Sequence, residues 1–527
     1  MAENAVESSG DVTLDNAVKQ WLKFDKNSKT AACVREMVKT GNIDELRKCF
    51  GTRMEFGTAG LRAAMGPGVS RMNDLTIIQT TQGFCRYLEQ CFEDLKLRGV
   101  VIGFDARQHT PSGGSSKRFA SLAAAVFISR GVPVHLFSVF TPTPYVPFTV
   151  SRLGLCAGIM VTASHNPKQD NGYKVYWENG AQIISPHDKG IATAIEENLE
   201  PWAESWDTEA ALQSALLKDP YQDIHREYMQ SIQQHCYYRF THTHTHTADR
   251  EGATIVLAND PDADRLAMAE KQISGEWKVF SGNELGALLG WWTFRCWKEK
   301  QGEKFTSSVK DVYMLASTVS SKILRAIALK EGFHFQETLT GFKWMGNRAK
   351  QLLDQGKTVL FAFEEAIGYM CSPAVLDKDG VSAAAIAGEM ISYLSSKNTS
   401  VSQQLKAIYE ENYNGANTYP QDCQGFAITA VRDLTTGYDS NQSDRKAILP
   451  TSKSSQMITF NFANGGVATM RTSGTEPKIK YYTELCAAPG NSDLTRLKEE
   501  LNSLVDAIVK NFFQPEKNNL ISRPESD

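Results

Sequence analysis

The sequence lacks several features that mark secreted and membrane proteins. Ten cysteines are scattered along 527 residues with no CxxC pair, so their spacing indicates no disulfide framework, and reduced thiols are the simplest interpretation. No run of about 18 apolar residues occurs, as a transmembrane helix would require. The first stretch, MAENAVESSGDVTLDN, has neither the basic nor the apolar region of a signal peptide. We therefore expect a cytoplasmic protein.

A strong excess of charge of one sign is also missing. The formal net charge is -4 at pH 7, which creates no general basic field to attract nucleic acid or an anionic membrane. We expect neither as a partner. Any affinity for anions must come from local groups.

The pattern that is present alternates strands and helices over a chain long enough for several domains. Residues 99–163 and again 311–365 read as successive βαβ units, which predict mainly parallel sheets with ligand sites at the carboxyl ends of the strands. An additional apolar strand is predicted at 253–260. The last hundred residues predict antiparallel strands followed by a helix. The expected fold class is α/β, with successive mixed α/β domains and a C-terminal α+β domain.

Ser164 lies in MVTASHNPKQDNGYKVY, directly after an apolar strand pattern, where an α/β sheet presents side chains to a ligand. A serine that only caps a turn is one interpretation. A hydrolase nucleophile elbow is excluded, because it needs glycine two residues to either side, where Thr162 and Asn166 stand.

Three carboxylates follow the strand at 253–260 in NDPDADRLA, namely Asp260, Asp262 and Asp264. A solvated acidic loop is possible, but crowded carboxylates after an apolar strand favour a bound cation, and oxygen ligands of this kind suit magnesium. An EF-hand is excluded, because Arg265 and Lys271 occupy its glycine and glutamate positions.

Two further loops could enclose an anion. RTSGTEPKIKYY, at 471–482, brings a guanidinium, hydroxyl groups and a glycine into one short loop, as phosphate binding requires, although an ordinary turn has the same composition. EFGTAGLRAAMG, at 55–66, is glycine-rich and carries Arg62, and is weaker evidence by itself.

These four segments, in this order, resemble the α-D-phosphohexomutase superfamily. Four long segments are similar in sequence to the phosphopentomutase branch of that superfamily: TASHNPKQDNGYKVYWENGAQIISPHDKG, GNELGALLGWW, TLTGFKWMGNRAKQL and RTSGTEPKIKYY. The resemblance covers most of the chain, from about residue 15 to about residue 515.

The resemblance implies a role for each matching residue. The phosphoryl group would be carried by Ser164. Magnesium would be held by the phosphorylated Ser164 and by Asp260, Asp262 and Asp264. Cations near the transferring group would be Arg62 and Arg265. Proton transfer would involve His165 and Lys378. The sugar would face Thr340, Gly341 and Glu364. The phosphate that is not transferred would be held by Arg471, Ser473, Gly474 and Thr475.

The implied activity is that of a phosphomutase, an enzyme of the isomerase class. It would interconvert sugar 1-phosphates with ribose or deoxyribose 5-phosphate, or with glucose 6-phosphate, through a phosphoserine and a bisphosphate intermediate. The implied cofactors are Mg²⁺ and an activating sugar 1,6-bisphosphate or pentose bisphosphate, and we expect a monomer. A sugar-bisphosphate synthase and a catalytically impaired sugar-phosphate-binding variant are the alternatives. The expected domains are a phosphoserine domain at 1–190, a truncated metal-binding domain at 191–305, a sugar-binding domain at 306–412 and a phosphate-binding domain at 413–527.

The chain departs from the family pattern in three places. Ala366 stands where many members have a serine, which removes one hydroxyl from the sugar loop, and the connection at 408–423 is short. The βα unit that should open the metal-binding domain is absent, and THTHTHTADREG stands in its place at 241–252.

The Thr-His tract has three interpretations. Its histidines could bind a transition metal, it could be a functional loop, or it could be a translated CA dinucleotide repeat, because ACA encodes threonine and CAC encodes histidine. The last interpretation implies an internal deletion. In that case we expect residues 236–252 to be irregular and exposed, and the metal loop to lie on a weakened scaffold.

Overall fold

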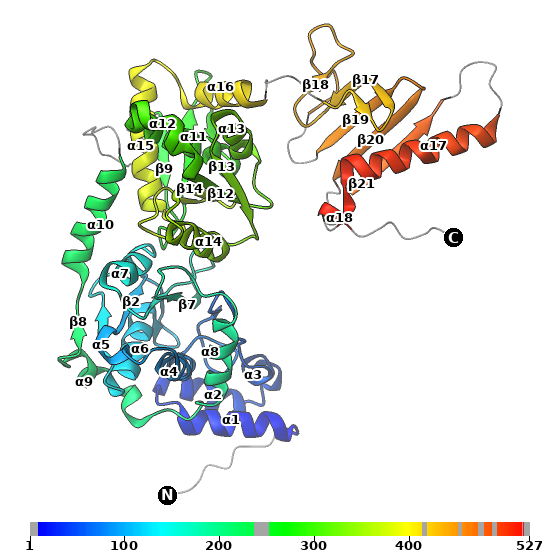
Figure 1. Cartoon of the computed structure of the whole chain (residues 1–527). Coiled ribbons are helices and arrows are strands. Elements are labelled where there is room, and N and C mark those ends of the chain that lie inside the picture. Colours follow the sequence, from blue (N-terminus) through cyan, green and yellow to red (C-terminus); the bar gives the residue numbers. More distant parts are fainter. Residues whose placement is uncertain are drawn as a thin grey trace, which may run out of the picture. The chain divides into compact units, whose positions relative to one another are not determined.

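The computed structural model describes residues 9–236, 252–413, 419–451, 456–472, 479–486, 493–518 and 520. The chain divides into two compact units, Met1–Asn412 and Tyr413–Asp527. In the described part of the chain, three larger sheets and a two-stranded ribbon belong to the first unit, and one large antiparallel sheet belongs to the second (Figure 1).

The first sheet carries the serine turn. Its strand order is β1-β7-β6-β2-β5-β8; β6, β2, β5 and β8 are parallel to one another, and β7 pairs antiparallel with both β6 and β1. The strands are β1 (Leu61–Ala64), β2 (Val100–Phe104), β5 (Val134–Leu136), β6 (Ala157–Val161), β7 (Asp170–Trp177) and β8 (Leu217–Lys218). A separate two-stranded ribbon joins β3 (Gln108–His109) to β4 (Gly114–Ser115). The predicted strands at 99–107 and 155–163 are therefore confirmed.

Helices cover both faces of this sheet. One face packs against α4 (Asp74–Cys91), α6 (Ser116–Ser129) and α8 (His187–Glu196), and the other against α7 (Tyr145–Leu153) and α10 (Tyr221–His235) (Figure 1). All residues of β2 are buried: Val100 and Ile102 join the first cluster and Val101 joins the second. This two-sided burial explains why the strand reads as a continuous apolar run.

Smaller helices complete this part of the chain. At the amino-terminal end, α1 (Val12–Phe24), α2 (Ser28–Lys39) and α3 (Ile43–Phe50) form their own small core around the buried Trp21. Two short helices, α5 (Leu95–Arg98) and α9 (Thr208–Leu212), lie in connections.

Another sheet of the first unit, formed by residues 312–370, carries the sugar loop. It has the order β13-β12-β14-β15, parallel except for β15. Its strands are β12 (Val312–Ser317), β13 (His334–Thr338), β14 (Thr358–Glu364) and β15 (Gly368–Met370), and its helices are α11 (Gly282–Gln301), α12 (Phe305–Ser308), α13 (Ile323–Glu331), α14 (Phe342–Asp354), α15 (Gly380–Ser396) and α16 (Val401–Tyr413). One face packs against α14 and the other against α11, α13 and α15. The predicted βαβ units at 311–365 are therefore confirmed.

In chain order, a three-stranded sheet comes between the first sheet and the sheet of the sugar loop. This sheet, which we call the metal-loop sheet, holds the acidic loop. Its order is β11-β10-β9, and both pairings are antiparallel, from β9 (Ile255–Ala258), β10 (Ala267–Lys271) and β11 (Trp277–Val279). The predicted strand at 253–260 is confirmed as β9, and its pairing is antiparallel because the acidic loop joins β9 directly to its neighbour β10. Leu266, Met268 and Phe280 join the same core as α11 and α15, whereas Val256 and Val279 are exposed.

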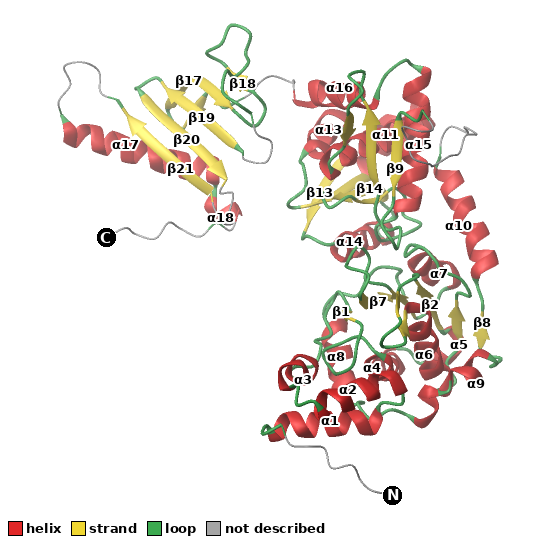
Figure 2. Cartoon of the chain, turned by 180° about the vertical axis from the view of Figure 1, so that it is seen from behind, coloured by secondary structure: helices red, strands yellow, loops and turns green. Residues whose placement is uncertain are grey.

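The second unit is the predicted α+β domain. Its sheet consists of β16 (Asp422–Cys423), β17 (Phe426–Asp433), β18 (Tyr438–Asp439), β19 (Met457–Phe462), β20 (Gly466–Thr472) and β21 (Ile479–Leu485), all paired antiparallel. The helix α17 (Leu494–Ile508) lies along one face, with Leu504 and Ile508 in the core (Figure 2), and a short α18 (Pro515–Asn518) follows.

The expected fold class is confirmed, whereas the four domain boundaries stay a prediction. Residues 241–251 of the Thr-His tract lie outside the described residues. Among the described helices, none has both the length and the hydrophobicity that crossing a membrane requires.

Candidate active site

Ser164 lies in a tight turn at the carboxyl end of β6. Its side chain is buried and its φ is +55°, in the left-handed region that costs a residue other than glycine about 1–2 kcal/mol. The Ser164 N–H donates to Thr162 Oγ1 at 2.8 Å, which helps to hold this conformation. The Ser164 hydroxyl donates to Asp260 Oδ2 at 3.0 Å, across 96 positions of sequence. The turn therefore aims the hydroxyl at the acidic loop.

The acidic loop is compact because of its backbone. Ala263 has a φ of +54°, and its N–H donates to the Asp260 carbonyl at 2.9 Å, so the loop turns back on itself. One oxygen from each of Asp260, Asp262 and Asp264 lies within 4.8 Å of the others. The Oδ1 atoms of Asp262 and Asp264 are buried and have no hydrogen-bond partner among the described residues, and Arg265 Nε lies 3.8 Å from Asp264 Oδ1, beyond hydrogen-bond distance. Buried carboxylate oxygens left unpaired in this way fit a divalent cation such as magnesium.

A buried lysine balances part of this negative charge. Lys174 Nζ, from β7, donates to Asp262 Oδ2 at 2.7 Å and to Asp264 Oδ2 at 3.1 Å. Thr143 Oγ1 donates to the same Asp262 oxygen at 2.7 Å. Burial raises the pKa of Asp262, but Lys174 and Thr143 outweigh burial and leave that pKa below its usual value. Asp262 is therefore ionised near neutral pH.

Asp260 differs from its neighbour Asp262, because no lysine of the described residues forms an ion pair with it. Burial first, and then the charges of Asp264 and Asp262, raise the pKa of Asp260 to about 6. The hydrogen bond from Ser164 acts in the opposite direction. Asp260 is thus the carboxylate of the cluster whose ionised form most needs an additional cation.

Lys378 lies beside the acidic loop and forms ion pairs with Asp264 and Asp377. Lys378 Nζ lies 3.5 Å from Asp264 Oδ2, and burial, which lowers the pKa of Lys378, is outweighed by Asp264, Asp377 and Glu364, so that this pKa is raised. Burial raises the pKa of Glu364. Gly368 lies between these two side chains, since a Cβ there would meet Lys378 Cδ at 2.4 Å and Glu364 Cγ at 3.2 Å.

The remaining residues around Ser164 are a histidine and two arginines. His165 Nδ1 lies 3.4 Å from Ser164 Oγ, and burial, together with Arg265 and Arg62, lowers the pKa of His165, so its imidazole is neutral at pH 7. Arg62, on β1, donates to Asn166 Oδ1 at 3.0 Å. Arg265 donates its backbone N–H to Asp260 Oδ1 at 3.1 Å.

The predicted sugar loop follows β13. Thr340 is exposed, and Gly341, with a φ of +103°, immediately precedes α14. Lys343, in the first turn of α14, contacts Thr58 Oγ1 in the glycine-rich loop that precedes Arg62. The structure thus connects the sugar loop to the glycine-rich loop.

The predicted phosphate loop belongs to the second unit. Arg471 is near the end of β20, in register with Met457 of β19. Ser473, Gly474 and Thr475 lie outside the described residues.

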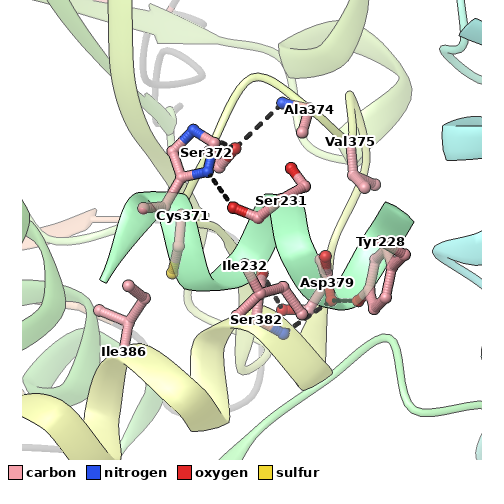
Figure 3. Close-up of a pocket in the computed structure, with 11 residues that line it drawn as sticks. Tyr228, Ser231, Ile232, Cys371, Ser372, Ala374, Val375, Asp379, Ser382 and Ile386 are labelled. Atoms are coloured by element: carbon pink, nitrogen blue, oxygen red, sulfur yellow. Dashed lines mark hydrogen bonds between the residues drawn. The ribbon is translucent and has the colours of Figure 1, made fainter. Parts of the chain in front are cut away.

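A separate crevice with about 310 Å³ of empty space lies beside α10 (Figure 3). Its polar groups are already paired: Tyr228 donates to Asp379 Oδ1 at 2.7 Å, and His235 Nε2 lies 3.0 Å from Ser372 Oγ. Asp379 also caps α15, directly after Lys378. We interpret this crevice as part of the support behind Lys378 and not as the active site.

Lys174 and Thr143 were missed by the sequence analysis. Lys174 stands within NGYKVY, a strand that is otherwise buried, and a lysine in that setting usually has an acidic partner. This pattern was a usable signal for the ion pair, although not for the identity of the partner. Thr143, in TPTPY, carries no such signal.

Comparison with known families agrees with this geometry. Residues 53–202 match the model of the phosphoglucomutase/phosphomannomutase α/β/α domain I, and residues 281–412 match domain III of the same family. The chain belongs to the phosphoglucomutase/phosphomannomutase family. Members of this family also share its fold in solved structures: the phosphoglucomutase parafusin from Paramecium, at 18% identity, covers 90% of this chain and 97% of its own with a TM-score of 0.50.

Two relatives within the family are similar over nearly their whole length. Phosphopentomutase from Homo sapiens is 61% identical, over 99% of this chain and 100% of that protein, and glucose 1,6-bisphosphate synthase from Homo sapiens is 49% identical, over 98% and 97%. The alignment with the phosphopentomutase spans 614 positions, whereas this chain has 527 residues. Part of that relative therefore has no counterpart here, as expected for an internal deletion.

Proposed function

We propose that this chain is a phosphomutase that moves a phosphoryl group between two hydroxyls of a pentose or hexose through phosphorylated Ser164. The observation that carries the proposal is the Ser164 hydroxyl, held 3.0 Å from Asp260 beside a buried cluster of three carboxylates. The 61% identity to a phosphopentomutase supports the same reaction.

The proposed reaction is one exchange performed twice. The bond from phosphorus to Ser164 Oγ breaks while a bond forms from phosphorus to a free hydroxyl oxygen of the sugar phosphate. The hydroxyl proton passes to a base and Ser164 Oγ takes up a proton, which gives a sugar bisphosphate and free serine. The bisphosphate then reorients, and the reverse exchange returns its other phosphate to Ser164.

Charge neutralisation is the main task of the protein in this exchange. A phosphoserine carries about -1.5 to -2 charges at neutral pH, so an anionic sugar phosphate approaches only if cations surround it. Arg62 and Arg265 are the proposed side-chain cations. Asp260, Asp262 and Asp264 would hold magnesium, which when bound neutralises charge on the transferring phosphate.

Two side chains suit the proton transfers. His165, with its lowered pKa, is neutral and can accept the proton of the attacking hydroxyl. Lys378 is the second proposed side chain; its raised pKa keeps it protonated, so its ammonium can donate a hydrogen bond to a reacting oxygen. We propose Thr340, Gly341 and Glu364 as contacts to the sugar, and Arg471, Ser473, Gly474 and Thr475 as contacts to the phosphate that is not transferred.

A coupled assay tests the function directly. Purified protein is given ribose 1-phosphate or glucose 1-phosphate with a sugar bisphosphate, and formation of the 5- or 6-phosphate is followed. Net accumulation of bisphosphate would instead favour a sugar-bisphosphate synthase, for which the 49% identical relative is the supporting observation. Binding of sugar phosphate without turnover would identify a catalytically impaired variant.

Removal of metal should abolish turnover. Because the unpaired oxygens of Asp262 and Asp264 would repel the phosphoserine without a cation, we expect a chelator to reduce kcat by about 100-fold or more, and magnesium to restore it. Steady-state assays with and without chelator make this measurement. Full activity in the absence of divalent metal would contradict the proposed site.

Ala366 should favour pentoses. It is exposed in the turn after β14 and offers no hydroxyl to a hexose, so we expect kcat/KM for ribose 1-phosphate to equal or exceed that for glucose 1-phosphate. Ala366→Ser should raise the relative value for glucose 1-phosphate about five- to tenfold, the worth of one hydrogen bond. Ala210→Ser, at an exposed position of α9, is the control. A strong preference of the unsubstituted chain for glucose 1-phosphate would refute this interpretation.

A further inference from the structure

The buried guanidinium of Arg107 donates hydrogen bonds to the backbone of the turn that carries Ser164. Only 7% of the Arg107 side chain is exposed. Its Nη2 donates to the carbonyl of Ser164 and, at 3.0 Å, to the carbonyl of Asn166. Its Nη1 donates to the carbonyls of Pro167 at 2.7 Å and Asp170 at 3.0 Å. Four carbonyls of one loop therefore converge on a single side chain.

Arg107 is itself anchored to the first sheet. Its Nε donates to Asp105 Oδ2 at 3.0 Å, so every donor group of the guanidinium has an acceptor. Asp105 follows β2, is buried, and also accepts from Ser116 Oγ at 2.5 Å at the start of α6. The guanidinium thus ties the serine turn to the carboxyl end of β2, the strand next to β6.

We propose that Arg107 is a positioning residue for phosphoryl transfer, which keeps Ser164 Oγ in line with the acidic loop while the serine alternates between its free and phosphorylated forms. This inference rests on the proposed function. Within the described part of the chain, the Arg107 guanidinium donates to backbone carbonyls and a carboxylate, and to no group assigned to the sugar. Its loss should therefore lower kcat and leave KM nearly unchanged.

Lysine cannot replace this arginine. A planar guanidinium offers five N–H groups in a fixed fork and can serve four carbonyls and a carboxylate together, whereas an ammonium offers three donors from one point. Some of the carbonyls would lose their partner, and the strained Ser164 conformation would lose part of its support. A displacement of about 1 Å at a reacting atom can cost about 100-fold in rate.

Arg98, the last residue of α5 in the connection that leads into β2, is the control. It donates to the carbonyls of Gly154 at 2.7 Å and Leu155 at 3.2 Å, and to Glu178 Oε2 at 2.8 Å. These contacts resemble those of Arg107, but they hold the loop that enters β6, whereas Arg107 holds the turn that leaves it. If Arg107 only stabilised the fold, its replacement by lysine should change kcat no more than the same replacement of Arg98.

The test compares Arg107→Lys with Arg98→Lys for kcat, KM, labelling of Ser164 by a radiolabelled sugar bisphosphate, and amide hydrogen exchange of residues 163–171. We expect Arg107→Lys to lower kcat by about 100-fold and to change KM by less than about threefold, and Arg98→Lys to leave kcat within about twofold. Exchange at 163–171 should accelerate only in Arg107→Lys. Added guanidinium should restore at least about tenfold of the kcat lost in Arg107→Ala.

Several outcomes would overturn the proposal. Equal kcat in the two lysine variants, a loss confined to KM, or unchanged exchange at 163–171 in Arg107→Lys would each do so. If the unsubstituted chain takes up no label and shows no turnover, the proposed function fails, and the exchange measurement still decides whether Arg107 holds the turn.

Discussion

Ser164→Ala is expected to abolish mutase turnover, with kcat reduced by about 10⁴-fold or more, while the protein stays folded. The substitution removes the only atom that carries the phosphoryl group in the proposed reaction. It keeps a side chain of similar size, and alanine experiences the same strain as serine at a φ of +55°. The hydrogen bonds lost are those to Asp260 and His165, which lie at the acidic loop and the serine turn and not in a packed core.

The measurement combines steady-state turnover with labelling by a radiolabelled sugar bisphosphate. Ser205→Ala, at a buried serine of the same unit that donates to Gln82 Oε1 at 3.1 Å, is the control and should retain turnover and label uptake. Equal turnover in the two variants would exclude the phosphoserine mechanism. Label that persists in Ser164→Ala would assign the phosphate to another residue, such as an aspartate of the acidic loop.

Lys174→Met should be the most destabilising single substitution in the site. The Lys174 ammonium is buried against Asp262 and Asp264, whose side chains are 0% and 1% exposed. Removal of one partner leaves uncompensated buried charge, which typically costs about 3–5 kcal/mol of unfolding free energy. Since magnesium would neutralise the same carboxylates, we expect Lys174→Met to lower the free energy of unfolding more in chelator than in saturating magnesium.

Urea unfolding in both conditions makes this measurement. Lys357→Met, which breaks an exposed ion pair with Asp311, is the control and should have a much smaller effect. Asp262→Asn added to Lys174→Met should recover part of the lost stability in chelator, because the second change removes one of the unpaired charges. If Lys174→Met unfolds at the same urea concentration as Lys357→Met, the buried ion pair does not stabilise the site.

The relation between Ser164 and the acidic loop was predicted from the resemblance to the phosphohexomutase superfamily. The position of each segment after an apolar strand indicated a ligand site there, but not that the two segments meet. The pairing of β9 was not predicted, because period and composition identify a strand but not its neighbours. The metal-loop sheet is antiparallel, since the acidic loop is too short to cross over to a parallel partner.

The contacts of Arg107 and Lys174 could not be predicted from the sequence. Arg107 acts on backbone carbonyls, which every residue has, so no pattern of residue types identifies its targets. Lys174 meets Asp262 from 88 positions away, and the sequence offers several carboxylates as alternatives. Contacts of this kind depend on tertiary packing, which local patterns do not encode.

The left-handed backbone of Ser164 also decides which hydroxyl amino acid can carry the phosphate. Serine and threonine present equivalent oxygens to a phosphoryl group, and chemistry alone would accept either. At a φ of +55°, however, the branched Cβ of threonine would crowd its own backbone, whereas serine adopts this conformation at modest cost. A Ser164→Thr chain would therefore have to reshape the turn before it could be phosphorylated, so backbone geometry reserves this position for serine.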